Sequence, residues 1–313
     1  MKRPKALVTG GAGFIGSNLV KLLIDKHWEV RVLDNFSTGN IRNLKDLDVE
    51  IIDGDIRKYK VVESAGSGID VVFHMAACVG RQRSIDNPQL DSSVNLIGTI
   101  NVLESMRVNK IKRIVYSSSA AIFGELIESS ISEDHPQNAD SPYGVSKLAA
   151  EKMILAYSKI YGFIGVCLRY FNIYGSNQRF DVYGNVIPIF AKNINDNECI
   201  TIYGDGNQTR DFLNVKDVAN ANFLASTKAM ETDVFNLGSG STITINELAD
   251  MMQKISGKKV SIKYTPRRPA DVLHCKAKID KIEKVLGFEP TVSIQDGLKE
   301  YLHWFDNYCI TEK

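Results

Sequence analysis

Apolar residues in the first half of the chain form short runs that alternate with segments of helical periodicity. The runs are near-continuous in β-branched and aromatic residues, which is typical of strands buried on both faces of a parallel sheet. Six strands are predicted in this way, at 6–9, 29–34, 49–56, 70–77, 113–117 and 164–170.

Helical patterns separate these strands. Ile15, Leu19, Leu22 and Leu23 would share one face of a first helix. Further helical segments are predicted at 89–109 and at about 142–161. Right-handed crossovers between such units build a doubly wound sheet that binds ligands at the carboxyl ends of its strands. The pattern therefore predicts an α/β fold with a Rossmann-type parallel sheet.

Beyond Asn172 the strict alternation weakens, and loops rich in Gly and Asn follow. We expect a dinucleotide-binding Rossmann domain at 1–172, to which the chain returns at about 214–236. A smaller C-terminal α/β substrate domain is expected at 173–313. Within 173–313, helices are predicted at 214–228, 245–255 and 294–305, and a strand is predicted at 234–237.

The turn after the first predicted strand carries Gly10, Gly13 and Gly16 at intervals of three. This spacing suits a tight turn, a close approach of backbone to a pyrophosphate, and close packing of the helix on its strand. The N-terminus of that helix would favour phosphate. Asp34 ends the second strand, where a carboxylate can accept both ribose hydroxyls and repel a 2′-phosphate, so NAD is favoured over NADP. An ordinary glycine-rich turn is the alternative for the motif alone.

Composition narrows the class of protein. The 38 Lys and Arg residues nearly balance 37 Asp and Glu residues, which gives no support to nucleic acid or an anionic membrane as partner. The sequence shows no leader segment and no apolar run long enough to span a bilayer, so a cytoplasmic protein is expected. The scattered cysteines predict reduced thiols and no metal site; they are Cys78, Cys167, Cys199, Cys275 and Cys309.

Two polar groups of residues could carry chemistry. Ser117 and Ser119 lie where the fifth strand ends, beside the expected cofactor crevice, and Tyr143 and Lys147 share one face of the later helix. A phenol with a pKa of about 10 is a poor base at neutral pH. Lys147 and a positive nicotinamide would favour its ionised form. A solvated surface contact is the alternative for the Tyr-x-x-x-Lys pair alone.

With these motifs the chain resembles the extended short-chain dehydrogenases/reductases of the NAD-dependent sugar-nucleotide epimerase/dehydratase family, over essentially its whole length. The resemblance implies that Tyr143 is the catalytic base, that Lys147 binds the nicotinamide ribose, and that Ser119 hydrogen-bonds the reacting sugar hydroxyl. It is closest to the 4-epimerases of UDP-glucose and UDP-N-acetylglucosamine. The motifs are 9–16, 34–39, 54–56, 74–77, 95–99, 117–119, 143–147, 169–175 and 203–212.

The resemblance also assigns binding residues and a homodimer formed by the helices near 89–109 and 142–161. By it, the cofactor contacts Gly10, Gly13, Phe14, Ile15, Gly16, Asp34, Asn35, Ser37, Gly39, Asp55, Ile56, Ala76, Ala77, Asn95, Ser117, Tyr143, Lys147 and Tyr170. The UDP-sugar contacts Ser119, Tyr143, Asn172, Asn185, Val186, Tyr203, Arg210, Arg268, Asp271 and Cys275. Paired arginines suit a pyrophosphate because guanidinium makes bidentate contacts. Asp217 is taken to be an exposed charge.

The residues after Ser119 bear on the reaction. Similar dehydratases carry an acid pair there that removes a hydroxyl from the sugar, whereas this chain has Ala120 and Ala121. Alanine transfers no proton, so the resemblance favours 4-epimerisation through a transient 4-keto sugar.

The resemblance indicates that Cys275 determines which sugar is accepted, because a bulky Tyr at the matching position of similar epimerases excludes an N-acetyl group. The small side chain favours UDP-GlcNAc and UDP-GalNAc, with UDP-Glc and UDP-Gal as further substrates. A buried small apolar residue is the alternative for Cys275. For the whole chain, the alternatives are a nucleotide-sugar dehydratase or reductase of the same family and a non-catalytic NAD-sensing regulator.

Overall fold

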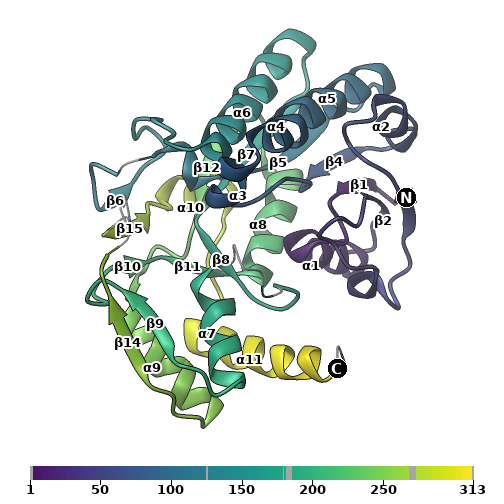
Figure 1. Cartoon of the computed structure of the whole chain (residues 1–313). Helices are drawn as coiled ribbons and strands as arrows, with labels where there is room; N and C mark the ends of the chain where they lie inside the picture. Colours follow the sequence, from purple (N-terminus) through teal and green to yellow (C-terminus); the bar gives the residue numbers. More distant parts are fainter. Residues whose placement is uncertain (1–2, 125, 179, 181–184, 268–272, 312–313) are drawn as a thin grey trace.

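A seven-stranded parallel sheet forms the centre of the larger part of the molecule (Figure 1). The structure is a computed structural model that describes residues 3–124, 126–178, 180, 185–267 and 273–311. The spatial order of the strands is β12 (Asp233–Leu237), β7 (Ile164–Tyr170), β5 (Arg113–Ser119), β4 (Val71–His74), β1 (Lys5–Thr9), β2 (Glu29–Asp34) and β3 (Glu50–Asp53).

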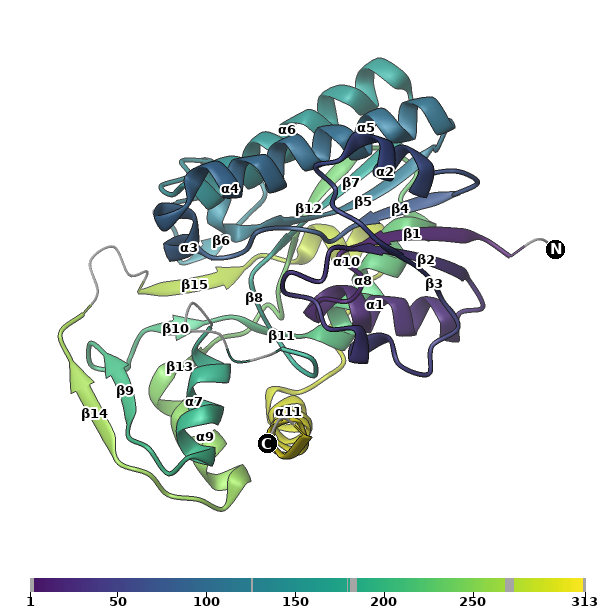
Figure 2. The ribbon, with the colours of Figure 1, turned by 45° about the vertical axis from the view of Figure 1, so that its right-hand side comes forward.

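Helices cover both faces of this sheet, as Figure 2 shows. One face packs on α2 (Tyr59–Ala65), α5 (Gly98–Asn109) and α6 (Pro142–Tyr161), and the other on α1 (Phe14–Asp25), α8 (Val215–Lys228) and α10 (Asp280–Leu286). Strand β1 serves both cores, because side chains alternate along a strand. Ala6 and Val8 join the core under α1 and α8, and Leu7 joins the core under α5 and α6. The predicted doubly wound α/β fold is confirmed.

The helical segment expected at 89–109 consists of three parts. A short helix α4 (Pro88–Ser92) leads into a π-helical turn (Ser93–Ile97), and α5 follows without a break. The helix α3 (Arg81–Asp86) precedes them. Such π-helical turns are rare and occur frequently at functional sites.

Helix α6 has the bounds that the sequence predicts because both of its ends are encoded locally. Ser141 caps its start, accepting the Gly144 N–H at 3.2 Å, and Pro142 takes the first position. Gly162, with a φ of 68°, ends it in the left-handed conformation.

The smaller part of the molecule holds three short sheets and a separate core (Figure 2). The sheets are β13 (Ile243–Thr244), β10 (Thr209–Arg210), β15 (His274–Ala277) and β6 (Ser130–Ile131); β11 (Phe212–Asn214) with β8 (Asn172–Tyr174); and β14 (Ile262–Thr265) with β9 (Ile200–Tyr203). The core gathers α7 (Val186–Asn195), α9 (Ile245–Ser256) and α11 (Ile294–Thr311).

Several local expectations differ from the structure. Strand β3 is shorter than the apolar run at 49–56, and β5 extends two residues beyond 117, so that Ser119 is its last residue. Asp217 is not an exposed charge but is 2% exposed, and its carboxylate accepts hydrogen bonds from Thr291 and Val292. Among the described helices, none has both the length and the apolar character needed to cross a membrane.

Candidate active site

The glycine turn between β1 and α1 brings bare backbone to the carboxyl end of β1. Gly10 has a φ of 69°, and a Cβ atom there would lie 2.7 Å from the backbone of Ala76. A Cβ atom on Gly16 would collide with the carbonyl oxygen of Gly10. Gly13 is the N-cap of α1, so no capping side chain stands between the start of this helix and a ligand. Phe14 and Ile15 form the first turn behind it.

Asp34 lies at the carboxyl end of β2, beside this turn. Its two carboxylate oxygens accept the N–H groups of Ala12 and Phe36, each at 2.9 Å. Burial raises the pKa of Asp34, and these backbone hydrogen bonds oppose the rise. Gly39 approaches so closely that a Cβ atom would lie 3.0 Å from the Asp34 carboxylate. The loop after β2 is thus wrapped around a carboxylate whose position is fixed.

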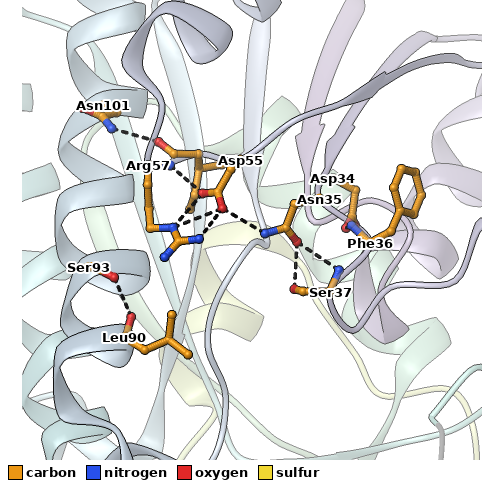
Figure 3. Close-up of polar contacts among 10 residues, drawn as sticks. Asp34, Asn35, Phe36, Ser37, Asp55, Arg57, Leu90, Ser93 and Asn101 are labelled. Carbon is orange, nitrogen blue, oxygen red and sulfur yellow. Dashed lines mark hydrogen bonds and ion pairs between the residues drawn. The ribbon is translucent and has the colours of Figure 1, made fainter.

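A second acidic group follows β3, and Figure 3 shows how it joins the loop after β2. Asn35 donates to Asp55 at 3.1 Å and accepts the N–H and hydroxyl of Ser37 at 3.1 and 2.7 Å. Arg57 forms an ion pair with Asp55 and holds the pKa of that carboxyl well below its usual range. The carbonyl oxygen of Ile56 accepts the Asn101 side chain at 2.9 Å.

A buried polar ladder lies at the carboxyl ends of β1 and β4. His74, the last residue of β4, bonds through one ring nitrogen to Thr9 at 2.7 Å and through the other to Thr99 at 2.9 Å. Burial lowers its pKa to about 3, so the imidazole is neutral. Ser117 donates its hydroxyl to the His74 carbonyl oxygen at 3.0 Å. Ala76 and Ala77 continue the chain from here along the crevice.

The expected catalytic residues come together where β5 meets the start of α6. The Ser119 hydroxyl lies close enough to Tyr143 to lower the pKa of its phenol, and it also accepts the Ala121 N–H at 3.2 Å. Lys147 lies one turn further along α6, is only 2% exposed, and has its ammonium 4.3 Å from the centre of the Tyr116 ring. The structure therefore brings together Ser119, Tyr143 and Lys147 from two elements that are distant in the sequence.

Burial controls the protonation of this pair. It raises the pKa of Tyr143 to about 12, although the hydrogen bond from Ser119 lowers it. It lowers the pKa of Lys147 to about 7, against the attraction of Asp91. The protein groups alone therefore do not produce the lowered phenol pKa that the sequence led us to expect.

Two buried networks behind the pair were not predicted from the sequence. Glu151, one turn beyond Lys147, forms an ion pair with Arg169 of β7 at 2.7 Å and accepts the Ser118 hydroxyl at 2.7 Å. Asn95, expected to contact the cofactor, bonds through its side chain to the backbone of Cys78 at 2.8 and 3.0 Å. Two signals in the sequence could have indicated the first network. Ser118 lies between the two serines expected in the site, and Glu151 follows Lys147 by four residues.

The residues expected to hold the UDP-sugar lie on the short strands of the smaller part. Arg210 of β10 and Cys275 of β15 are paired in parallel register. Burial raises the pKa of the half-buried Cys275 thiol to about 11, and Arg210 partly opposes this. Asn172 donates its side-chain N–H to the Asp211 carbonyl oxygen at 3.1 Å.

Asp211 joins these strands to the large sheet. Its carboxylate is fully buried and accepts the N–H groups of Ser239 and Gly240, in the loop after β12, and of Ala277 in β15. The expected substrate residues of β10 and β15 are therefore held at the carboxyl edge of the sheet.

The remaining predicted residues are more dispersed. Tyr170, at the end of β7, bonds through its hydroxyl to the buried Asn222 at 2.9 Å. Asn185 is the exposed N-cap of α7, with Val186 next to it, and Tyr203 ends β9 with 37% of its surface exposed. Two predicted substrate residues, Arg268 and Asp271, lie outside the described residues.

The first half of this site fits a dinucleotide. The turn at Gly10 and Gly16 has room for backbone only, and the start of α1 and the carboxylate of Asp34 face the same edge of the sheet. Such an edge suits a pyrophosphate and a ribose diol.

Comparison with known proteins agrees with this arrangement. The family model described as GDP-mannose 4,6 dehydratase matches residues 7–301. The UDP-glucose 4-epimerase of Halalkalibacterium halodurans is 35% identical over 313 residues, covering 94% of this chain and 93% of that protein.

Two solved structures are similar over nearly the whole chain. The UDP-N-acetylglucosamine 4-epimerase of Methanobrevibacter ruminantium, in complex with UDP-N-acetylmuramic acid, is 33% identical, with a TM-score of 0.93, and 98% of this chain and 100% of that one are covered. The Thermus thermophilus UDP-glucose 4-epimerase, in complex with NAD, is 35% identical, with a TM-score of 0.89 and coverage of 96% and 99%. The protein therefore belongs to the GDP-mannose 4,6 dehydratase family, the extended short-chain dehydrogenases/reductases that include sugar-nucleotide epimerases and dehydratases.

Proposed function

We propose that this protein is an NAD-dependent UDP-sugar 4-epimerase that prefers the pair UDP-GlcNAc and UDP-GalNAc and also accepts UDP-Glc and UDP-Gal. The observation that carries the reaction type is the proximity of Ser119 to Tyr143, whose phenol pKa Ser119 lowers, in a strand end that continues as Ala120 and Ala121. The site thus offers one group that can exchange a proton with a sugar hydroxyl. The segment 120–124 holds no carboxyl group for a dehydration.

The chain's own residues handle the proton. The turn at Gly10 to Gly16 and the Asp34 carboxylate would hold NAD, and NAD would supply the acceptor and the donor for the hydride of C4. Tyr143 accepts the proton of the C4 hydroxyl, so that the sugar becomes a 4-keto sugar, and it gives the proton back when the carbonyl is reduced. Ser119 bonds to the same oxygen and keeps it within reach of the phenol. If the 4-keto sugar rotates in the pocket between these two proton transfers, its opposite face is reduced and C4 is inverted.

Lys147 tunes this proton exchange electrostatically. A protonated ammonium on the same face of α6 stabilises the phenolate of Tyr143, and the positive nicotinamide acts in the same direction. Because the pKa of Lys147 is lowered to about 7, the supporting charge is present below neutral pH and is lost as pH rises. Rates should therefore decline on the alkaline side.

The preference for N-acetylated sugars rests on Cys275. Cys275 is the backbone register partner of Arg210 across β10 and β15. Because Arg210 is a cationic residue expected to hold the pyrophosphate, the sugar would lie within reach of β15. A side chain of this size leaves space beside the sugar that a tyrosine would fill.

The test is product analysis by NMR after separate incubations with UDP-GlcNAc, UDP-Glc and their C4 epimers, without added NAD. We expect a mixture of C4 epimers from each pair and faster turnover of the acetylated one. A 4-keto-6-deoxy product, or net consumption of a reduced cofactor, would instead indicate a dehydratase or a reductase. Cys275→Tyr should abolish turnover of the acetylated sugars and spare UDP-Gal, and an equal loss of both would contradict the assigned role of Cys275.

We also propose that the protein acts as a homodimer through α4, α5 and α6. Large apolar side chains stand exposed along these helices, which is typical of an interaction surface. They include Leu90, Ile97, Val108, Val145 and Ile160, which are 37% to 67% exposed. Light scattering on a size-exclusion column should give twice the 34.8 kDa mass of the chain, and Val145→Glu should shift the protein towards the monomer.

A further inference from the structure

A buried carboxylate that the proposed chemistry does not use lies directly behind the catalytic helix. Asp91, in α4, is 0% exposed. One of its oxygens accepts the Ser146 hydroxyl at 2.6 Å, and the other accepts the Asn95 amide at 3.0 Å. Both neighbours can donate to it, as suits a carboxylate, which accepts hydrogen bonds only. Burial raises the pKa of Asp91, and the Ser146 hydrogen bond and the charge of Lys147 oppose this rise.

The contact with Ser146 fixes the turn of α6 that carries the catalytic pair. Ser146 lies between Tyr143 and Lys147, and its single hydroxyl proton has two acceptors within reach, Asp91 at 2.6 Å and the Tyr143 carbonyl oxygen at 3.0 Å. The shorter bond to a charged acceptor is the stronger one. The hydroxyl therefore ties α6 to α4 rather than bonding within its own helix.

The π-helical turn after α4 contributes to this link. Asn95 sits inside that turn and bonds at once to Asp91, to Ser146 and to the backbone of Cys78. Three elements thus meet at the Asp91 carboxylate, namely α4, the π-helical turn and α6, and Asn95 links them to the loop after β4.

Asp91 is also the uncompensated charge near Lys147. The groups facing Lys147 are His74 from β4, Tyr116 from β5, Cys167 from β7, Tyr143 and Glu151 from α6, and Asp91 from α4. Burial lowers the pKa of His74 to about 3 and raises the pKa values of Tyr116, Cys167 and Tyr143, so these groups are neutral at pH 7. Glu151 is paired with Arg169 at 2.7 Å. Among the ion pairs of the described residues, none within 4.0 Å includes Asp91 or Lys147.

We propose that Asp91 is a positioning residue for the catalytic pair: through Ser146 it orients the turn of α6 that carries Tyr143 and Lys147, and its carboxylate favours the protonated form of the Lys147 ammonium. This inference rests on the proposed function. Asp91 touches neither the sugar nor the cofactor in this role, so it acts on the rate and its pH dependence and leaves substrate affinity alone.

The perturbation is Asp91→Asn, which keeps the size of the side chain and removes its charge. Without this charge, burial lowers the pKa of Lys147 further, because the Asp91 carboxylate raises it in the native protein. The alkaline limb of kcat should therefore move to lower pH by about one unit, the scale set by an opposite charge nearby. KM for the UDP-sugar should stay within about twofold, since the ground-state contacts are unchanged.

A direct titration keeps the test independent of turnover. The 13Cε resonance of Lys147, identified by its loss in Lys147→Met, should titrate at lower pH in Asp91→Asn than in the native protein. Ser146→Ala should shift it in the same direction by a smaller amount: burial raises the pKa of Asp91, the Ser146 hydrogen bond opposes this rise, and its loss therefore favours the neutral carboxyl.

The matched control is Asp217→Asn. Asp217 is also buried, at 2% exposed, and it accepts three hydrogen bonds from Thr291 and Val292. This variant should lose stability without moving the Lys147 titration. An unchanged titration in Asp91→Asn, or an equal shift in Asp217→Asn, would overturn the proposal. If the native protein epimerised no UDP-sugar while the titration still moved, the proposed function would fail and the electrostatic link between Asp91 and Lys147 would stand.

Discussion

Arg169→Met tests whether the buried ion pair behind the active site is as consequential for stability as its geometry indicates. The Arg169 and Glu151 side chains are 1% and 0% exposed, and the guanidinium donates to both oxygens of the carboxylate at 3.1 and 2.7 Å. It donates a third bond to the Glu133 carbonyl oxygen at 2.8 Å. Methionine fills much of the volume and supplies no donor, so the Glu151 charge is left with the Ser118 hydroxyl.

The expected cost follows from that uncompensated charge. Breaking a buried pair by removing one partner costs about 3–5 kcal/mol, whereas replacing both partners is often close to neutral. Arg169→Met should therefore lower the free energy of unfolding, measured by urea denaturation followed by circular dichroism, by about 3–5 kcal/mol. Adding Glu151→Gln should restore a large part of this loss.

An exposed pair provides the control. Lys216 and Glu300 are also 2.7 Å apart, but their side chains are 56% and 41% exposed. Lys216→Met should change stability by less than about 1 kcal/mol. If Arg169→Met cost no more than Lys216→Met, or if the double variant were less stable than Arg169→Met, the reasoning from burial and charge would be refuted.

Three further predictions concern the site itself. Tyr143→Phe should lower kcat at least about 100-fold by removing the proton carrier, while the NAD content of the purified protein stays unchanged; inversion of C4 at the native rate would exclude the role of Tyr143. Gly10→Ala should abolish NAD binding, because its Cβ atom would lie 2.7 Å from the Ala76 backbone. The NAD content is measured after acid release. As the control, Gly68→Ala should retain NAD, because Gly68 has a similar φ of 73° and no atom within 4 Å of the added Cβ. His74→Gln should reduce the decrease in the free energy of unfolding that accompanies a fall in pH. The pKa of His74 is about 3 in the folded protein, against an ordinary value of 6.5, so only the unfolded chain gains this proton as pH falls through 6.5. This lowers the free energy of unfolding by about 2 kcal/mol at pH 5. If the native protein and the variant lost the same free energy of unfolding between pH 7.5 and pH 5.0, the reasoning would be contradicted.

The fold was largely predictable because its signals are local. The strands have near-continuous apolar runs, and the ends of α6 are encoded by Ser141, Pro142 and Gly162. The bounds of β7 and α6 were predicted correctly. The short strands β10 and β15 carry no such signal. The two strands are far apart in the sequence, and the buried Asp211 next to β10 accepts N–H groups from Ser239 and from Ala277 of β15, contacts that only the tertiary structure shows.

Charged residues were the least predictable from sequence. Asp217 was taken to be exposed and is buried, since its partners Thr291 and Val292 follow it by more than seventy residues. Asp91 carried no signal either: a lone acidic residue in a polar helix is usually solvated, and only its distance to Ser146 shows otherwise.

The sequence by itself determined the parallel sheet, the glycine turn, and the motif residues Ser119, Tyr143 and Lys147, because these depend on periodicity, backbone sterics and spacing along single elements. The tertiary structure alone decided which charges are buried and paired, and therefore the protonation of the catalytic pair. Burial is set by packing between α4, α6 and the sheet, and the electrostatic energy of a charge depends on everything around it. The glycines and the Tyr-x-x-x-Lys spacing thus indicate where the proposed chemistry would take place, and the tertiary structure adds the buried contacts of Asp91, Glu151 and Arg169 behind that place.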